Sequence, residues 1–375
     1  MADWTVPLAD VRFDEGDVAA VAEVYREGWV TMGPRVERFE AAFAAFLGRR
    51  HAIAVASATT ALHLLAVGLG LEEGDEVVMP SLTFVATASA FRHTGARPVF
   101  ADVAALDRPW PEAADYEAVL TPRTRAVVTM AYGGHPGDVA AVARLAERRG
   151  LPLVEDAAHA PGASVGGHAV GAFGIGSAFS FYSNKNLPVG EGGLVATDDH
   201  DLAARLRRLR SHGTTSGTWA RHQGDARDYD VVEPGFNYRL DEPRAALALR
   251  RLERLGADNA RRRDLSARYR RALAGVPGLL PAAEAAGDAV TAAHLFTVVL
   301  PEGTDVAGVR GHLQRRGVQT SLHYPPVHRL SAYASGARLP NTEAYAQRAV
   351  TLPLSPELSE DQQDLVVAAL LAALG

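Results

Sequence analysis

The spacing of hydrophobic residues along the chain predicts strands and helices in alternation. Short apolar runs predict strands at residues 51–55, 76–80, 98–101, 126–130, 153–156, 177–182 and 193–197. Hydrophobic residues at intervals of three or four predict helices at residues 14–27, 35–47, 59–68, 83–93, 139–149 and 203–210. Repeated strand–helix units of this kind are typical of an α/β fold with a mostly parallel sheet.

The pattern changes in the last third of the chain. Residues 211–236 show no clear periodicity and predict a long loop, which is uncommon in a compact domain unless it is functional. A long helix is predicted from about residue 241 to 274, and a smaller α/β pattern follows it, with a strand at 293–300 and helices at 306–316, 341–349 and 359–373. We therefore expect a large domain at residues 1–245, with helices at its start, and a small C-terminal α/β domain at residues 246–375.

Composition and charge exclude several classes of protein. The chain has 375 residues, 47% of them hydrophobic, and a formal net charge of −6, so it can bury a sizeable core and is only mildly acidic. This balance argues against a general binder of nucleic acid or of membrane surfaces. The absence of cysteine removes disulfides, thiolate metal sites and cysteine nucleophiles, and we expect no metal centre. Because no signal-peptide pattern or membrane-spanning apolar run is visible, we expect a cytoplasmic enzyme or binding protein.

One residue type occurs only once in the chain. Lys185 is the only lysine, and every other basic residue counted with it is an arginine. It follows an aromatic run at residues 179–182 and precedes a glycine-rich turn at residues 190–193. An arginine stays charged near neutral pH, whereas a lysine amine can lose its proton and form a Schiff base. The alternative is a surface lysine without a chemical role.

An acidic residue complements this lysine. Asp156 ends the strand at residues 153–156, and Lys185 follows the strand at residues 177–182. In open α/β sheets ligands bind beyond the carboxyl ends of the strands, so both side chains are expected at one crevice, with Glu155 on the opposite face. Pyridoxal phosphate needs a lysine to hold its aldehyde and a carboxylate against its ring nitrogen. The pair therefore suggests a pyridoxal phosphate site, although Asp156 could instead cap a helix.

Other side chains near the same strand ends are candidates for cofactor contacts. The strand–turn–helix around Thr59 and Thr60 is a phosphate-binding geometry, and both threonines could instead be helix caps. Phe84 could stack on the cofactor ring or belong to the core. Ser180 could reach the phosphate, and His159 could contact the ring hydroxyl or be structural.

Short motifs occur in order along nearly the whole chain. They are Gly28-Trp29-Val30-Thr31-Met32-Gly33-Pro34, Ser57-Ala58-Thr59-Thr60-Ala61-Leu62, Pro80-Ser81-Leu82-Thr83-Phe84, Glu155-Asp156-Ala157-Ala158-His159-Ala160, Phe179-Ser180-Phe181-Tyr182 through Lys185-Asn186, Gly235-Phe236-Asn237-Tyr238-Arg239-Leu240-Asp241-Glu242, and His323-Tyr324-Pro325 with His328. Several ordered motifs are far more specific than any single one. Together they resemble the DegT/DnrJ/EryC1/StrS family of pyridoxal-phosphate-dependent sugar aminotransferases.

The resemblance implies the aminotransferase type I fold and a homodimer with its active sites at the interface. By motif, Lys185 is similar to the lysine that holds the cofactor, Asp156 to the partner of the ring nitrogen, and Phe84 to the stacking aromatic. Further cofactor contacts are implied for Ala58, Thr59, Thr60, His159, Ser180 and, from the neighbouring subunit, Asn237. Substrate contacts are implied for Thr31, Tyr182, His323 and Tyr324.

The resemblance also implies amino transfer in two half-reactions. Glutamate or glutamine gives its amine to the cofactor, which then aminates a keto sugar carried on a nucleotide. The segment Asn184-Lys185, with Gly190-Glu191-Gly192-Gly193, resembles members that aminate the 4-keto carbon of a 6-deoxy sugar. A nucleotide-linked 3-keto sugar and a keto-cyclitol of an aminoglycoside pathway are alternatives, because members with these substrates share the motifs. A non-catalytic sensor of sugar or cofactor is a further alternative, which the retained lysine disfavours.

Overall fold

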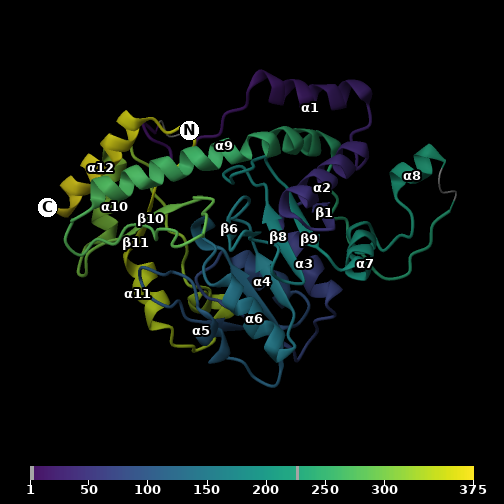
Figure 1. The fold of residues 1–375 in the computed structure, drawn as a ribbon, viewed down its shortest axis with the longest axis horizontal. Coiled ribbons are helices and arrows are strands. Elements are labelled where there is room, and N and C mark those ends of the chain that lie inside the picture. Colours follow the sequence, from purple (N-terminus) through teal and green to yellow (C-terminus); the bar gives the residue numbers. More distant parts are fainter. Residues whose placement is uncertain (1–3, 225–227) are drawn as a thin grey trace.

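The computed structural model describes residues 4–224 and 228–375 (Figure 1). Its helices are α1 (Glu15–Glu27), α2 (Pro34–Leu47), α3 (Ala58–Gly68), α4 (Val85–Arg92), α5 (Ala113–Glu117), α6 (Val139–Arg149), α7 (His200–Arg210), α8 (Thr218–Gln223), α9 (Glu242–Leu273), α10 (Val306–Arg315), α11 (Pro340–Arg348) and α12 (Glu360–Leu374). Its strands are β1 (His51–Val55), β2 (Glu76–Pro80), β3 (Arg97–Ala101), β4 (Thr124–Met130), β5 (Leu153–Asp156), β6 (Ser164–Val165), β7 (His168–Ala169), β8 (Gly176–Ser180), β9 (Gly193–Thr197), β10 (Phe296–Val299) and β11 (Ala349–Leu352).

Seven of these strands form one sheet, in the order β1-β9-β8-β5-β4-β2-β3. From β3 to β8 all neighbours are parallel, whereas β9 is antiparallel to both β8 and β1. The fold is therefore α/β with a mostly parallel mixed sheet, as the hydrophobic pattern predicts. The strand expected at residues 177–182 ends earlier, at Ser180, so that Tyr182 and Lys185 lie in the turn beyond it.

Helices cover both faces of this sheet. Successive strand residues point to opposite faces, so Ile53 and Val55 of β1 pack with α3, α4 and α7, whereas Ala52 and Ala54 pack with α2 and α9. Nearer β3, α5 and α6 pack on residues such as Val78. Burial on both faces explains why the strands appear in the sequence as continuous apolar runs rather than as alternating patterns.

A second hydrophobic core lies at the C-terminal end of the molecule. β10 and β11 form an antiparallel pair, with α10, α12 and the end of α9 packed around it. Val6 joins this core and pairs with Val318, so both chain ends lie on this side (Figure 1). β11 was not predicted, because it follows α11 without an intervening turn. The expected domain boundary near residue 245 falls inside α9 and stays a prediction.

The segment expected to be a long loop contains the short helix α8. This helix lies at the right-hand edge of the molecule in Figure 1, and the ring of Trp219 contacts that of Trp29, with centroids 4.8 Å apart. At the base of the loop, a Cβ on Gly235 would lie only 2.2 Å from the backbone nitrogen of Gly213. The two sides of the loop therefore touch where it leaves the fold, and a side chain at Gly235 would separate them.

Glu242 joins the start of α9 to the start of α2. Its buried carboxylate accepts hydrogen bonds from the backbone N–H groups of Gly33, Arg35 and Val36, each at 2.9 Å. Helix geometry leaves such N-terminal amides without partners, and Gly33 offers no side chain to cap them. Glu242 therefore takes the place of an N-cap for α2. It joins the motif at residues 235–242 to the motif at residues 28–34.

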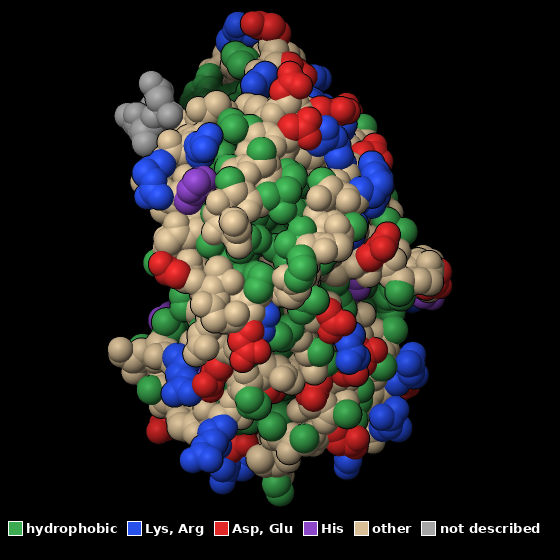
Figure 2. Space-filling model, turned by 90° about the vertical axis from the view of Figure 1, so that its left-hand side faces the viewer, with side chains coloured by type: hydrophobic (Ala, Val, Ile, Leu, Met, Phe, Trp, Pro, Cys, Tyr) green, Lys and Arg blue, Asp and Glu red, His purple; other side chains and the backbone are tan. Residues whose placement is uncertain are grey.

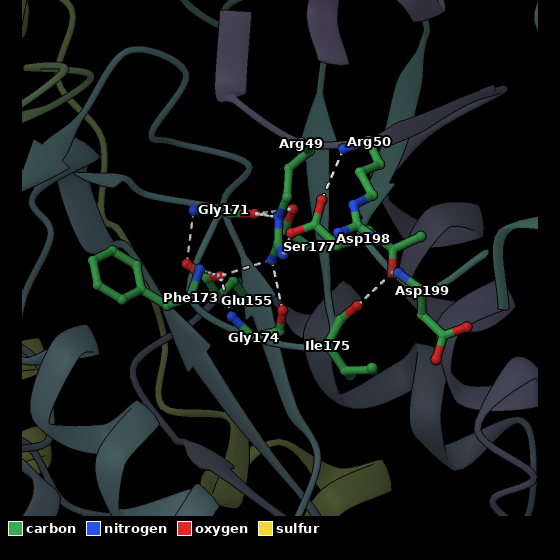
Figure 3. Close-up of polar contacts among 11 residues, drawn as sticks. Arg49, Arg50, Glu155, Gly171, Phe173, Gly174, Ile175, Ser177, Asp198 and Asp199 are labelled. Atoms are coloured by element: carbon green, nitrogen blue, oxygen red, sulfur yellow. Dashed lines mark hydrogen bonds and ion pairs between the residues drawn. The ribbon is translucent and has the colours of Figure 1, made fainter. Parts of the chain in front are cut away.

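Glu155 points to the sheet face opposite Asp156, as the alternation of strand side chains predicts. Its carboxylate accepts hydrogen bonds from three backbone N–H groups of the turn at residues 171–174, at 2.7 to 2.8 Å. Arg49, whose side chain is buried, donates to two carbonyls of the same turn and to Asp198 (Figure 3). This network fixes the end of β5, and with it Asp156, from behind.

The surface around α10 and α12 carries charges of both signs. Figure 2 shows basic and acidic side chains interspersed on this side of the molecule, with hydrophobic side chains gathered between them. Interspersed charges keep the electrostatic potential of such a face small. Among the described residues, no helix is long and apolar enough to cross a membrane.

Glu76, at the start of β2, is a buried carboxylate with three partners. It accepts hydrogen bonds from Arg97, Arg123 and Thr121 at 2.5, 2.6 and 2.7 Å. Burial raises the pKa of this carboxyl group, but the hydrogen bonds outweigh burial and lower the pKa from 4.5 to about 2. Because the folded pKa lies below the unfolded one, the stabilisation is present above about pH 4.5 and is lost as the pH falls toward about 2.

Glu76→Gln should therefore lower the free energy of unfolding by about 1–2 kcal/mol at neutral pH, since it removes the charge from these hydrogen bonds. The difference from the parent protein should shrink as the pH is lowered from neutral to about 3.5. Urea unfolding at both pH values measures it, with exposed Glu147→Gln as the control. An equal loss of stability at both pH values would contradict the assignment.

Candidate active site

A cavity of about 450 Å³ lies beyond the carboxyl ends of the central strands. It is lined by Ser57, Ala58, Thr59, Leu62, Phe84, Ala86, Met130, Asp156, Ala158, His159, Ser180, Tyr182, Asn184, Lys185, Glu191, Gly192, His323 and Tyr324. Every site residue expected from the sequence lines this cavity except Thr31, Thr60 and Asn237. Open α/β sheets bind ligands in this position, so the cavity is the candidate active site.

Lys185 lies in the turn after β8, partly buried in the wall of the cavity. Burial lowers the pKa of its amine from 10.5 to about 8, and the nearby Asp156 carboxylate acts in the opposite direction. The amine therefore loses its proton far more readily than that of a surface lysine. A lysine with a lowered pKa is suited to act as a nucleophile and as a base.

Asp156, at the end of β5, is held from two sides. Thr87 Oγ1 donates to Asp156 Oδ2 at 2.6 Å, and the Ala158 N–H donates to Oδ1 at 3.1 Å. Burial raises the pKa of Asp156, and these hydrogen bonds and Lys185 act against that rise. A buried carboxylate of this kind is suited to face a cationic group of a ligand, because the positive charge offsets the cost of burying the negative one.

Sequence reasoning missed Thr87. Its hydroxyl also lies 2.6 Å from Thr83 Oγ1, so two threonines support Asp156 from the start of α4. The signal was present in the sequence, because Thr83 and Thr87 flank Phe84 at the helical spacing of four residues and therefore share one side of the turn. Threonine is common at the start of a helix, so this pattern indicates a helix start rather than a ligand site.

His159 is tied into the opposite wall of the cavity. Its Nδ1 accepts a hydrogen bond from the Gly133 N–H at 3.3 Å, and its Nε2 lies 2.9 Å from the Tyr324 hydroxyl. Burial lowers the pKa of His159 well below its usual value, as do Lys185 and His323, so the ring is neutral. With Nδ1 as the acceptor, the single proton lies on Nε2 and is donated to Tyr324.

Aromatic and imidazole groups surround the mouth of the cavity. Phe84 is 53% exposed, and its ring centroid lies 5.6 Å from that of Tyr324. An exposed aromatic ring on a cavity wall can stack on a planar ligand. Tyr182 is similarly exposed, whereas burial lowers the pKa of His323 to about 4, and its Nδ1 lies 2.8 Å from Thr351 Oγ1.

The N-terminus of α3 opens into the cavity. Ser57 is the N-cap: its hydroxyl accepts from the Thr60 N–H at 3.2 Å, and Thr60 Oγ1 donates to the Ser57 carbonyl at 2.8 Å. The N–H groups of Ala58 and Thr59 have no partners within a helix and suit an anion at the positive end of the helix dipole. A Cβ on Gly193 would lie 2.3 Å from the Ser57 backbone carbon, so glycine is required where β9 meets this turn.

Thr31 and Asn237 lie outside the cavity, and the Thr60 hydroxyl is engaged in the helix cap. Thr31 is exposed in the turn before α2. Asn237 is exposed at the end of the long loop, where its backbone pairs with Ser211. The role expected for Asn237 is in a neighbouring subunit, and it stays a prediction.

These residues fit pyridoxal phosphate. A lysine of low pKa, a buried carboxylate and an exposed aromatic ring surround one cavity, and a helix N-terminus opens into it. These are the groups needed to hold the aldehyde, ring nitrogen, ring face and phosphate of this cofactor. The fold and site therefore define a pyridoxal-phosphate-dependent enzyme.

Residues 12–371 match the sequence profile of the DegT/DnrJ/EryC1/StrS aminotransferase family, and the chain belongs to this family. The aminotransferase TlmJ from Streptoalloteichus hindustanus is 35% identical, with 98% of each chain covered and a TM-score of 0.92. DesV from S. venezuelae, solved in complex with a ketimine intermediate, is 40% identical, with 95% of this chain and 94% of that chain covered and a TM-score of 0.87. The sugar aminotransferase CalS13 from Micromonospora echinospora is 29% identical, with 98% of this chain and all of that chain covered and a TM-score of 0.89.

These likenesses confirm the fold, the cofactor and the class of enzyme that the motifs predict. The fold is that of the type I pyridoxal-phosphate-dependent aminotransferases, and the protein is a sugar aminotransferase that uses this cofactor. Family members have been solved in forms with pyridoxal phosphate and with pyridoxamine phosphate. The relatives are enzymes, so the alternative of a non-catalytic sensor is disfavoured.

Thr87→Val should weaken cofactor binding, because it removes one hydrogen bond to the buried Asp156 carboxylate while keeping the side-chain shape. Such a bond contributes about 1.5–3 kcal/mol, which corresponds to an affinity loss of about tenfold or more. Thr87→Ser keeps the donor and should bind the cofactor nearly as tightly as the parent. Fluorescence titration of the cofactor-free proteins with pyridoxal phosphate measures the three affinities. A parent-like affinity of Thr87→Val would show that the bond does not support the cofactor site.

Proposed function

We propose that the protein moves an amino group from glutamate or glutamine to a keto sugar carried on a nucleotide, specifically at the 4-keto carbon of a 6-deoxy sugar. The observation that carries the proposal is the convergence of Lys185, Asp156 and Phe84 on one cavity in a chain of this family. The 4-keto position is supported by the resemblance of the Asn184-Lys185 segment and the glycine-rich turn at residues 190–193. A cytoplasmic location is part of the same proposal.

Several residues would hold and orient the cofactor. When bound, pyridoxal phosphate supplies an electron sink for the carbon that loses or gains the amine. Asp156 would hold a proton at the ring nitrogen, Phe84 would cover one ring face and exclude water, and His159 would lie near the ring hydroxyl. The phosphate would be held by the first-turn amides of Ala58 and Thr59 and by the hydroxyls of Thr59 and Ser180. Thr60 would support this turn through its helix-cap hydrogen bonds to Ser57.

Lys185 has two tasks in this scheme. Its amine would bind the aldehyde carbon of the cofactor and, once released, would move a proton to and from the substrate carbon that bears the nitrogen. The lowered pKa of about 8 keeps a useful fraction of the amine unprotonated near neutral pH. Asp156, close to it, favours the protonated form and so prevents a still lower pKa.

The sugar would lie against the mouth of the cavity. Asn184 Oδ1 is buried there and has no hydrogen-bond partner among the described residues. A buried acceptor without a partner is costly, and a hydroxyl group of the substrate would satisfy it. We assign further substrate contacts to Tyr182, His323 and Tyr324, which line the same opening, and to Thr31 in the assembled dimer.

A homodimer with shared sites would complete this cavity. Among the described residues that line it, none is an arginine, although the donor carboxylate and a nucleotide pyrophosphate both need cations. Asn237 is exposed, and the loop before it carries exposed apolar side chains, including Tyr229, Val231 and Val232, which are more than half exposed. These features support a loop that packs on a second subunit and brings Asn237 to the phosphate there.

Absorbance spectroscopy tests the reaction. The purified protein with pyridoxal phosphate should show the visible band of the bound cofactor, and glutamate or glutamine should bleach it. A nucleotide-linked 4-keto-6-deoxy sugar should restore the band, because the amine leaves the cofactor. Lys185→Arg is the matched control, since it keeps the cation but cannot form a Schiff base. It should fold, and its spectrum should change neither with the amino donor nor with the keto sugar.

The outcomes separate the alternatives. Restoration only by a nucleotide-linked 3-keto sugar, or only by a keto-cyclitol, would overturn the 4-keto assignment. A band that no amino donor bleaches would overturn amino transfer itself.

Mixing inactive subunits tests the shared site. Lys185→Ala and Asn237→Ala homodimers should each be impaired, whereas their mixture, after subunit exchange, should regain up to about a quarter of the parent activity per site through heterodimers with one intact site. Activity assays before and after exchange measure this recovery. If the heterodimer, verified by mass spectrometry, shows no recovery, Asn237 does not complete a neighbouring site.

A further inference from the structure

A buried group of three polar side chains lies behind Lys185. Asn186, Asn259 and His294, here called the amide clamp, are only 4%, 2% and 5% exposed. They come from the Lys185 turn, from the middle of α9 and from the segment before β10. None of them lines the active-site cavity, and none was a candidate in the sequence.

The hydrogen bonds of the amide clamp fix the orientation of the Asn186 amide and the position of the proton on His294. Asn186 Nδ2 donates to Asn259 Oδ1 and to the Ala292 carbonyl, both at 2.7 Å. Asn186 Oδ1, which can only accept, lies 2.9 Å from His294 Nδ1, so the His294 ring carries its proton on Nδ1. Reversing the Asn186 amide would bring its oxygen against two other acceptors, so the network permits only this orientation.

The clamp connects the lysine turn to the segment that follows Asp156. Asn259 Nδ2 donates to the Pro161 carbonyl at 2.8 Å. Gly162 fits against this amide because it lacks a side chain: a Cβ there would lie 2.6 Å from Asn259 Nδ2. The residue next to Lys185 is thereby tied, through one side chain, to the chain that carries Asp156 and His159.

His294 also sets the surroundings of the amine. Its ring centroid lies 4.3 Å from that of His159. Lys185 interacts electrostatically with both rings, with Asp156 and with His323, and the titratable side chains of Glu191, Tyr182 and Tyr324 line the same cavity. Burial lowers the pKa values of His159 and His294 well below the usual range, and that of His323 to about 4. The amine therefore shares its cavity with the Asp156 and Glu191 carboxylates and interacts with three neutral rings.

We propose that Asn186, Asn259 and His294 are positioning residues that hold Lys185 in its water-poor place and so keep its amine reactive near neutral pH. The proposal rests on the proposed function only in taking Lys185 as the reacting amine. Without the clamp the lysine turn would relax toward solvent, where the ammonium form is hydrated and preferred.

The single lysine makes a direct test possible. In the full-length protein freed of cofactor, an amine-acylating reagent can modify only Lys185 and the N-terminal amine, which serves as the internal reference. Labelling across a pH range, followed by peptide mass spectrometry, gives the pH at which Lys185 is half-reactive. We expect this midpoint at about pH 8 in the parent protein. Asn259→Ala should raise the midpoint by about one pH unit or more, toward that of a hydrated lysine.

Matched variants separate positioning from stability. Asn341→Ala removes two amide hydrogen bonds to the carbonyls of Val103 and Ala104, which do not line the cavity, and should leave the midpoint unchanged. His294→Asn keeps a donor where Nδ1 stands and should stay near the parent, whereas His294→Leu loses it and should move with Asn259→Ala. If Asn259→Ala does not fold, the two His294 variants decide the question.

Two results would overturn the proposal. One is an unchanged midpoint in folded Asn259→Ala or in His294→Leu, which would make the clamp a purely structural feature. The other is a parent midpoint at the ordinary lysine value. The measurement uses neither substrate nor turnover, so it can succeed even if the proposed keto-sugar substrate is wrong. Failure of the clamp proposal and failure of the proposed function are therefore distinguishable.

Discussion

Placing one amine and one carboxylate together in a poorly hydrated cavity is the constraint on which the rest of this structure depends. Burial alone disfavours the charged forms of both groups, which lowers the pKa of Lys185 and raises that of Asp156, while each charge favours the other. The balance leaves a lysine that can release its proton and a carboxylate that can face a cationic ring nitrogen. Both groups must therefore be held in place by partners that carry no net charge.

The surrounding fold supplies such partners. Thr87 and the Ala158 N–H hold the Asp156 carboxylate directly, and the Glu155–Arg49 network holds the same strand end from behind. On the lysine side, neutral amides and imidazoles take this role. The charges of Glu155 and Arg49 lie on the opposite face of the sheet, where both side chains bind backbone groups.

Residue chemistry made the central part of the site predictable from the sequence. Lys185 and Asp156 stand out because a lone lysine and a strand-ending carboxylate have few structural uses together, and the strands stand out because both sheet faces are buried. Thr87 and Asn259 could not be predicted in the same way: their partners depend on side-chain contacts between distant segments, and Asn259 lies 73 residues from Asn186. Likewise, β11 has no turn before it, and α8 is too short to show helical periodicity.

The long helix α9 has a mechanical consequence. It has 32 residues and is therefore about 48 Å long, with Glu242 holding α2 at its start, its far end packed in the C-terminal core, and Asn259 near its middle. If the helix tilted as a rigid rod about its middle by about 5°, each end would move by about 2 Å while the middle hardly moved. The end joined to α2 and the end in the C-terminal core would therefore move in opposite directions, while Asn259 and the lysine turn bonded to it hardly moved.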